Sequence, residues 1–378
     1  MDSSQKLTNT DVKKLNKNRI FRLIYNSDKI SRQEIADQLG LSLPTVNQNL
    51  KMLMEDGLIE YVGNFISTGG RRAQAITINN NARKAISVNI KADYINVDVV
   101  GLKGQIIYSM AVKAQFSKSS AYIEKLTDAV RHAVDYVGAD ADDIMGVGVT
   151  VPGILDDEKQ ILISAPPLKA KNYDFTRLIS AIDYPVVVMN DARAEAYADH
   201  WFNGKPEDEK IYIMLGEGVG GAYINASAIR NGVHNRGGEF GHMVIHPGGK
   251  QCLCGKKGCF EAYVSEKVLS SELDMTLDNF FELAAQGNKN NSNVLDEYMD
   301  NLALGINNIY TMMDCDIVLG GTVAPYLKQY DNSIKERLVN DYSFDTDADY
   351  LRISDGGGRK SGLGAALSFV ARFIDGVE

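Results

Sequence analysis

A group of cysteines beside a histidine constrains this chain more than any other segment. Three of its four cysteines lie within eight residues of one another, and a histidine precedes the first of them by ten. Three thiolates and one imidazole can complete the tetrahedral coordination of a structural zinc ion. The set comprises His242, Cys252, Cys254 and Cys259. We therefore predict about one structural Zn²⁺ per chain.

The alternative interpretation of the cluster is a disulfide with one spare thiol. Disulfide scaffolds are small, secreted and dense in cysteine, whereas this chain has four cysteines in 378 residues. The N-terminus lacks the apolar segment of a secretory signal, and no apolar run reaches the roughly 18 residues that span a bilayer. We expect a cytoplasmic protein with no membrane partner, in which clustered thiols bind metal and the separate Cys315 is buried.

Charge divides the chain into two unequal parts. The whole chain has a net charge of -9, yet residues 1–85 contain 13 basic and 8 acidic residues, a net of +5. The remainder contains 27 basic and 41 acidic residues, a net of -14. A basic head on an acidic body indicates a separate module that binds a polyanion such as DNA.

The basic head has the pattern of a helix-turn-helix. Ser31 and Glu34 form a capping box at the start of a helix that ends at Gly40, and Ser42 caps the next helix. The second helix of such a pair enters the major groove of DNA. The polar side of this helix is therefore the expected DNA-reading surface, and it carries Pro44, Thr45, Asn47, Gln48 and Lys51.

Two expected strands, 58–62 and 75–78, flank a glycine-rich tip with Arg71 and Arg72. They resemble the wing of a winged helix, with the arginine pair placed for backbone or minor-groove contact. The alternative is a three-helix protein-interaction module with a solvated arginine pair. The charge segregation favours DNA, so we assign residues 1–84 to a winged helix-turn-helix DNA-binding domain.

The remaining residues, 85–378, repeat one order of α/β elements. The expected elements are strands 86–90, 94–100 and 105–112, helix 120–137, strands 146–149 and 186–189, then strands 210–215, 219–225 and 227–230, helix 293–313 and strand 317–319. Such duplication is typical of the two-lobed, actin-like sugar-kinase fold. Lobe one is expected at about 85–200 plus the C-terminal helix, and lobe two, with the zinc loop, at about 201–360.

Polar residues at strand ends indicate a small-molecule site between these lobes. Asp191 follows a buried strand, and Gly153 lies in a second loop at the same sheet edge, where α/β proteins bind ligands. Carboxylates accept paired hydrogen bonds from vicinal hydroxyls, as a sugar site requires. The alternative is that Asp191 only caps the helix that follows it.

The chain resembles the winged-helix repressor branch of the ROK family, which includes xylose-, N-acetylglucosamine- and glucose-responsive repressors. The resemblance covers essentially the whole chain and rests on the Asn-Asp-Ala, Gly-Glu-x-Gly-His and Cys-x-Cys-Gly-x-x-Gly-Cys-x-Glu motifs at 190–192, 238–242 and 252–261. It implies that the His/Cys set above binds structural zinc. It further implies sugar contacts from Asn190, Asp191, Glu239, His242 and Glu261.

Departures from the family's kinases favour a repressor over an enzyme. The first phosphate loop, glycine-rich in kinases, is here Asn89-Ile90-Lys91-Ala92-Asp93. The second places Glu217 where kinases have threonine, and a carboxylate repels ATP phosphates. Asp191, the base in the kinases, is retained and can still bind a sugar.

We therefore expect a sugar-responsive repressor that binds operator DNA, is released by a monosaccharide and forms a homodimer, because helix-turn-helix proteins usually read paired half-sites. The alternatives are a bifunctional ROK sugar kinase and a repressor controlled by a phosphotransfer protein. Pro166 and Pro167 stand where family members often have Asn-Leu, so one usual sugar hydrogen bond is in doubt. A pentose such as xylose, with fewer hydroxyls to satisfy, is slightly favoured.

Overall fold

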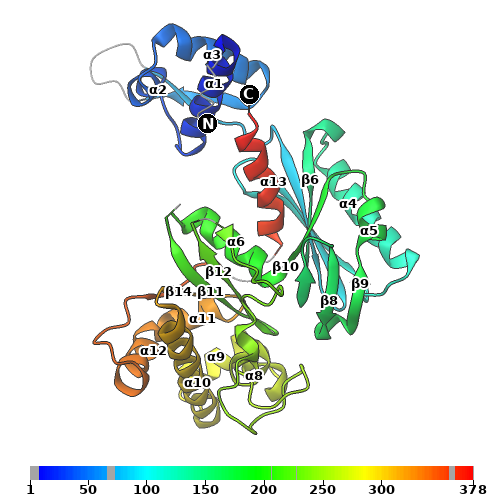
Figure 1. Ribbon diagram of the computed structural model, residues 1–378, viewed down its shortest axis with the longest axis vertical. Helices are drawn as coiled ribbons and strands as arrows, with labels where there is room; N and C mark the ends of the chain where they lie inside the picture. The colour runs from blue at the N-terminus through cyan, green and yellow to red at the C-terminus, as the bar shows by residue number, and fades with distance from the viewer. Residues whose placement is uncertain (1–7, 66–72, 206, 227, 357–361, 378) are drawn as a thin grey trace, which may run out of the picture.

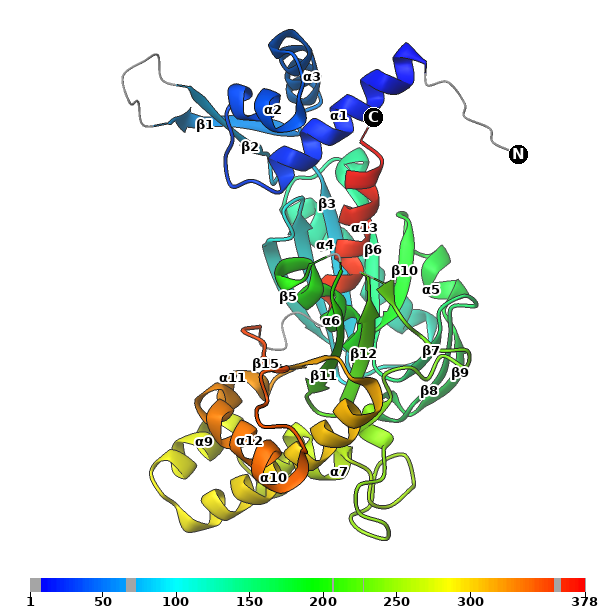
Figure 2. The same ribbon diagram turned by 60° about the vertical axis from the view of Figure 1, so that its left-hand side comes forward.

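The computed structural model describes residues 8–65, 73–205, 207–226, 228–356 and 362–377. A small N-terminal domain lies above a body of two lobes, each built on a five-stranded sheet (Figures 1 and 2). Two helices, α6 (Asp191–Asn203) and α13 (Leu363–Asp375), lie between these parts. The expected fold, a winged helix followed by a two-lobed α/β domain, is confirmed.

The N-terminal domain contains three helices and a two-stranded wing. Its elements are α1 (Asn9–Tyr25), α2 (Arg32–Leu39), α3 (Leu43–Glu55), β1 (Ile59–Asn64) and β2 (Gln74–Ile78), with the two strands antiparallel. The local signals act as expected: Ser31 and Glu34 form the capping box, Gly40 ends α2 in the left-handed region at φ 64°, and Ser42 caps α3. The wing tip that carries Arg71 and Arg72 lies outside the described residues.

Lobe one has the strand order β10-β6-β3-β4-β5. The elements are β3 (Lys84–Ile90), β4 (Tyr94–Gly101), β5 (Ile106–Lys113), α4 (Ser120–Tyr136), β6 (Ile144–Val151), α5 (Thr176–Ser180) and β10 (Val186–Asn190). All five sheet strands and α4 were expected within two residues at each end. A further three-stranded sheet was not expected; it comprises β7 (Ile154–Asp156), β8 (Ile161–Ala165) and β9 (Ala170–Asp174). Its strands are only three to five residues long, which is too short for a clear alternating pattern.

Lobe two has the strand order β13-β12-β11-β14-β15. Its strands are β11 (Glu209–Leu215), β12 (Val219–Asn225), β13 (Ala228–Ile229), β14 (Asp316–Gly320) and β15 (Leu351–Ile353). Its helices are α7 (Glu261–Val264), α8 (Glu266–Leu269), α9 (Leu277–Ala285), α10 (Lys289–Met313), α11 (Ala324–Leu327) and α12 (Asp331–Arg337). The helix expected at 293–313 begins earlier because the Asn288 side chain caps it. Cys315, expected to be buried, is only half-buried at the edge of this lobe's core.

Small residues let α6 approach both lobe two and α13. A Cβ atom placed on Gly220 of β12 would lie 2.8 Å from the Ala192 methyl carbon. A Cβ on Gly364 of α13 would lie 1.8 Å from the Ala194 carbonyl oxygen. Neither position tolerates a larger side chain without displacement, because protein interiors are close-packed. The helix α6 is therefore held on two sides.

The winged helix and lobe one share one hydrophobic core. Buried residues of α1, α3 and the wing belong to the same cluster as Leu102 and the apolar residues of α13. Polar contacts reinforce it: the Asn18 side chain donates to the Ile374 and Val377 carbonyls at 2.8 and 3.1 Å, and the Tyr25 hydroxyl donates to the Leu102 carbonyl at 2.9 Å. The winged-helix domain is thus packed on the body rather than tethered by a free linker.

The close approach of α13 to α6 can be tested by Gly364→Ala. The added methyl group must push the helices apart, and such overpacking typically costs about 1–3 kcal/mol of the free energy of unfolding. The substitution should be destabilising although alanine favours helix. Gly376→Ala is the matched control, because a Cβ there meets no atom closer than 3.3 Å. Urea unfolding curves measure both, and equal stabilities of the two variants would contradict the packing.

Candidate functional site

A cavity of about 320 Å³ lies between the two lobes. Its walls come from the ends of β3 and β10, the turn between β11 and β12, the segment containing η3 (Phe240–His242), and the loop after β14. This is the crevice at the carboxyl ends of strands where α/β proteins bind ligands. All the residues proposed for sugar binding line it: Gly153, Asn190, Asp191, Glu239, His242 and Glu261.

Asn190, rather than Asp191, caps α6. The Asn190 side chain accepts a hydrogen bond from the Arg193 amide at 2.9 Å and donates one to the Gly153 carbonyl at 2.9 Å. The interpretation of Asp191 as the helix cap is therefore wrong. Its carboxylate accepts from the Ala192 amide at 2.9 Å and from the Asn190 side chain at 3.3 Å, and it lines the cavity.

Asp191 forms an ion pair that sequence reasoning missed. The Lys91 ammonium lies 3.7 Å from the Asp191 carboxylate. Burial raises the pKa of Asp191, and the Lys91 charge opposes that rise. The sequence identified Lys91 only as part of the altered first phosphate loop. No sequence pattern indicates a contact between residues a hundred positions apart.

Arg193 was also missed, and it bridges the lobes. Its side chain is buried, and it donates to the Asp157 carboxylate of lobe one at 3.1 Å and to the Asn235 carbonyl of lobe two at 2.9 Å. Asn231 also donates to Asp157. A buried guanidinium with one acceptor on each lobe holds the cleft walls together at this edge.

Glu261 connects the cysteine loop to the turn after β11. One carboxylate oxygen accepts from the Val219 amide at 3.0 Å, and the other lies 3.5 Å from the Cys252 sulfur. Across the cavity, a Glu239 oxygen lies 3.8 Å from Nε2 of His242, and burial raises the pKa of Glu239. Glu261 thus lies against one thiol of the cluster, and Glu239 lies beside the histidine of the cluster.

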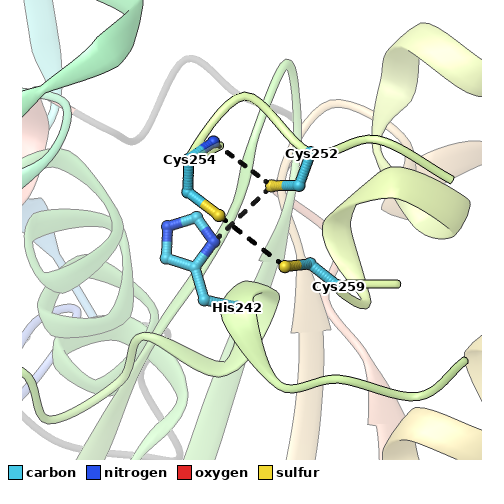
Figure 3. A group of neighbouring side chains, drawn as sticks. All are labelled: His242, Cys252, Cys254 and Cys259. Carbon is cyan, nitrogen blue, oxygen red and sulfur yellow. Dashed lines mark hydrogen bonds between the residues drawn. The ribbon is translucent and has the colours of Figure 1, made fainter. Parts of the chain in front are cut away.

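The three thiols and His242 point toward one another (Figure 3). Their four potential ligand atoms all lie within 4.8 Å of one another. The Cys254 and Cys259 sulfurs are 3.7 Å apart, and the Cys252 sulfur is 3.8 Å from Nδ1 of His242. Bonds of about 2.3 Å to thiolate give tetrahedral edges of about 3.8 Å, so the set fits a zinc ion. The alternative pairing into a disulfide is absent, since all three cysteines are free.

In the wall of the same cavity, α6 carries a second buried carboxylate, Glu195. Only 1% of it is exposed, and it accepts hydrogen bonds from the Tyr212 hydroxyl at 3.0 Å and the Gly321 amide at 2.8 Å. Burial raises the pKa of Glu195 to about 7. In the sequence Glu195 resembles any solvent-exposed helical glutamate, which is why its role was not predicted.

The helix α3 presents the polar side expected of a DNA-reading helix. Val46, Leu50 and Leu53 are buried, whereas Pro44, Asn47, Gln48 and Lys51 are exposed and Thr45 is half-buried. One further residue, Arg32 at the start of α2, was missed. Its guanidinium donates to the Asn47 side chain at 3.5 Å and to Gln74 of the wing at 3.2 Å, so it links the helix face to the wing.

Comparison with known proteins agrees with this architecture. The ROK family model matches residues 85–370, and a winged helix-turn-helix model matches residues 15–60. The chain therefore belongs to the ROK family. It is 28% identical to the xylose repressor of Bacillus subtilis over 82% of each chain, and 26% identical to the regulator NagC of Escherichia coli over 69% of this chain and 65% of that one.

Solved structures show the same fold. A ROK family transcriptional regulator, a homologue of the E. coli Mlc protein, superimposes with a TM-score of 0.74 at 20% identity over 97% of this chain and 98% of that one. A Streptomyces griseus ROK glucokinase in complex with glucose and AMPPNP has a TM-score of 0.62 at 25% identity over 75% of this chain and 98% of its own. Within the described residues, no helix is long and apolar enough to cross a bilayer.

The buried Glu195 predicts a pH dependence of stability. An unfolded glutamate loses its proton near its ordinary pKa, whereas Glu195 in the fold keeps its proton up to about pH 7. Between the ordinary pKa of glutamate and about pH 7, unfolding therefore releases a proton. In this range the free energy of unfolding falls as the pH rises, by at most about 1.4 kcal/mol per pH unit. Glu195→Gln should remove this part of the slope in urea unfolding between pH 5 and 7.5. The exposed Glu124→Gln on α4 is the control, and identical slopes for wild type and Glu195→Gln would refute the assignment.

Proposed function

We propose that this protein is a sugar-responsive transcriptional repressor of carbohydrate-utilisation genes, located in the cytoplasm and released from its operator by a monosaccharide. One observation carries the proposal: a winged helix with an exposed polar reading helix is packed onto a two-lobed body whose interlobe cavity is lined by several carboxylates. The relatives named xylose repressor and N-acetylglucosamine repressor support it.

In this proposal the sugar hydroxyls bind to the carboxylates of the cavity. Asp191, Glu239 and Glu261 approach from three elements, so adjacent hydroxyls can each donate to a fixed acceptor. Asn190 and His242 add one polar group each, and Gly153 lines the cavity beside Asn190, whose side chain donates to the Gly153 carbonyl. Pro166 and Pro167 line the same cavity without a side-chain hydrogen-bonding group, which favours a small sugar such as xylose.

The same cavity argues against phosphotransfer. In a ROK kinase the residue matching Asp191 must take a proton from a sugar hydroxyl. Here the Lys91 ammonium lies 3.7 Å from that carboxylate and opposes its protonation, although burial raises the pKa of Asp191. Glu217 lines the cavity at the second phosphate loop, and its charge would repel a nucleotide's phosphates. We therefore propose that the site binds a sugar without acting on it.

The metal assigned to the cluster is a structural zinc ion. His242 would bind it through Nδ1, since that nitrogen faces the Cys252 sulfur, while Nε2 faces Glu239 and the cavity. The three thiolates would supply the remaining ligands. A zinc ion here would hold the loop that carries Glu239 and Glu261, which commonly matters as much for binding as the ligands themselves.

The DNA interface is proposed to comprise the exposed face of α3 and the wing. Asn47 and Gln48 suit adenine edges, and Lys51 suits phosphate or guanine. The full proposed set is Pro44, Thr45, Asn47, Gln48, Lys51, Arg71 and Arg72, together with Arg32. A homodimer would present two such faces to paired half-sites.

The decisive experiment measures operator binding with and without sugar. The operator is first selected from random duplexes by the wild-type protein, and D-xylose, D-glucose and N-acetylglucosamine are then titrated. One of them should weaken wild-type binding by roughly 5- to 150-fold, as typical coupling energies imply. Asp191→Ala should bind the operator as the wild type does and show no release, because the differential sugar contacts are lost.

Three other outcomes of this experiment would point elsewhere. Asn47→Ala with Gln48→Ala should abolish operator selection, and unaltered selection would remove α3 from the interface. Sugar phosphate formed from ATP in proportion to wild-type protein, and lost in Asp191→Ala, would establish a bifunctional kinase. Intact operator binding with no response to any sugar would favour control by a phosphotransfer protein.

The zinc assignment predicts about one zinc per chain by elemental analysis of protein purified without chelators. Cys254→Ser should stay soluble, because the site is small relative to the two lobe cores, but should lose zinc and respond less to sugar. Cys315→Ser, which alters the cysteine outside the cluster, should keep its zinc. Wild-type protein without zinc would refute the assignment.

A further inference from the structure

The helix α6 joins the cavity to the DNA-binding domain. Its first residues, Asp191 to Arg193, line the cavity, and Trp201 in its last turn lies in the hydrophobic cluster of the winged helix. A helix of 13 residues spans about 20 Å. In Figure 1 it runs between the lobe-two sheet and α13, below the winged helix.

Buried carboxylates fasten one side of α6 to lobe two. Asp191, Glu195 and Asp199 recur every four residues and therefore share one face of the helix. Glu195 accepts from Tyr212 of β11 and from the Gly321 amide. Asp199 is fully buried, and it accepts from Arg352 at 2.6 Å and Ser354 at 2.8 Å. Because unmade hydrogen bonds of buried carboxylates are costly, α6 must follow lobe two.

The last turn of α6 contacts the first helix of the winged domain. The Trp201 and Tyr25 rings meet edge to face, with centroids 6.2 Å apart at 79°. Tyr25 is held in turn by its hydrogen bond to the Leu102 carbonyl. A further anchor of α1 is the end of α13, through the Asn18 bonds and an ion pair between Arg22 and Asp375. The helix α1 thus contacts α6, α13 and Leu102 of lobe one, and of these three α6 is the one fastened to lobe two by the carboxylates above.

We propose that α6 transmits the position of lobe two to the DNA-binding domain through the contact between Trp201 and Tyr25. A displacement of lobe two shifts α6 against α13. It therefore changes the contact of α1 with α6 but not the contacts of α1 with α13. This relay rests on the proposed function for its biological purpose, since the sugar would supply the displacement. The coupling itself is a property of the packing and is testable without sugar or DNA.

Two tyrosines of lobe two provide a matched pair of variants. Tyr212 and Tyr298 are both fully buried, and each donates one hydrogen bond, to Glu195 at 3.0 Å and to the Val264 carbonyl at 2.8 Å respectively. Replacing either with phenylalanine removes one buried hydroxyl. Only Tyr212→Phe loosens α6.

Hydrogen exchange and tryptophan fluorescence measure the consequence. Trp201 is the chain's only tryptophan, so its emission reports this contact directly. Tyr212→Phe should shift the Trp201 emission and speed amide exchange in residues 18–25 of α1, whereas Tyr298→Phe should change neither. In a Trp201→Leu background, Tyr212→Phe should no longer affect exchange in α1, because coupled changes are not additive.

Three results would overturn the relay. They are an unchanged α1 in Tyr212→Phe, equal effects of the two tyrosine variants, and an undiminished effect of Tyr212→Phe in the Trp201→Leu background. If Trp201→Leu does not fold, Trp201→Phe with Tyr25→Leu replaces it in the cycle. A wild-type protein that selects no operator would count against the proposed function alone, because these measurements use only the protein.

Discussion

The position of α6 depends on backbone approaches that only small residues permit. Gly220 admits the Ala192 methyl group on one side of the helix, and Gly364 admits the Ala194 carbonyl on the other. With the side faces this tight, a movement of lobe two must carry the helix along and repack its contacts, because packed interiors are bistable rather than continuously deformable. This one helix lines the cavity, carries the residues of the interlobe ion pairs and contacts the winged helix.

Charge inside the cleft is arranged around the same helix. Asp191 has a counter-ion in Lys91, and Arg193 has one in Asp157, so two buried charges on the first turn are paired across to other elements. Buried pairs of this kind add little net stability compared with apolar residues, but removing one partner is costly. Their effect is therefore on geometry: they specify one relative position of the cleft walls, around the carboxylates of Asp191, Glu239 and Glu261 that line the cavity.

Local signals allowed much of the fold to be predicted from sequence. The capping box at Ser31 and the left-handed Gly40 depend on neighbours within four residues, so their pattern is readable without tertiary information. The motifs likewise located the cysteine cluster and the cavity carboxylates. The missed features are long-range: the partner of Asp191 lies 100 positions earlier, Arg193 reaches two loops at once, and Arg32 meets the wing through space. The short strands β7–β9 were missed because three to five residues carry too little periodicity.

A repressor built on this fold needs the lobe movement of a kinase but not its chemistry. In a kinase, binding energy closes the cleft so that the base, the sugar and the nucleotide meet. Here the Lys91 ammonium already occupies the neighbourhood of Asp191, and α6 connects that carboxylate to α1 over a single helix. Sugar that binds one lobe arrangement more tightly than another shifts the population between them, whatever the fate of the sugar. A kinase uses the free energy of sugar binding to reach its transition state. In a repressor the same free energy can change how α6 contacts the DNA-binding domain.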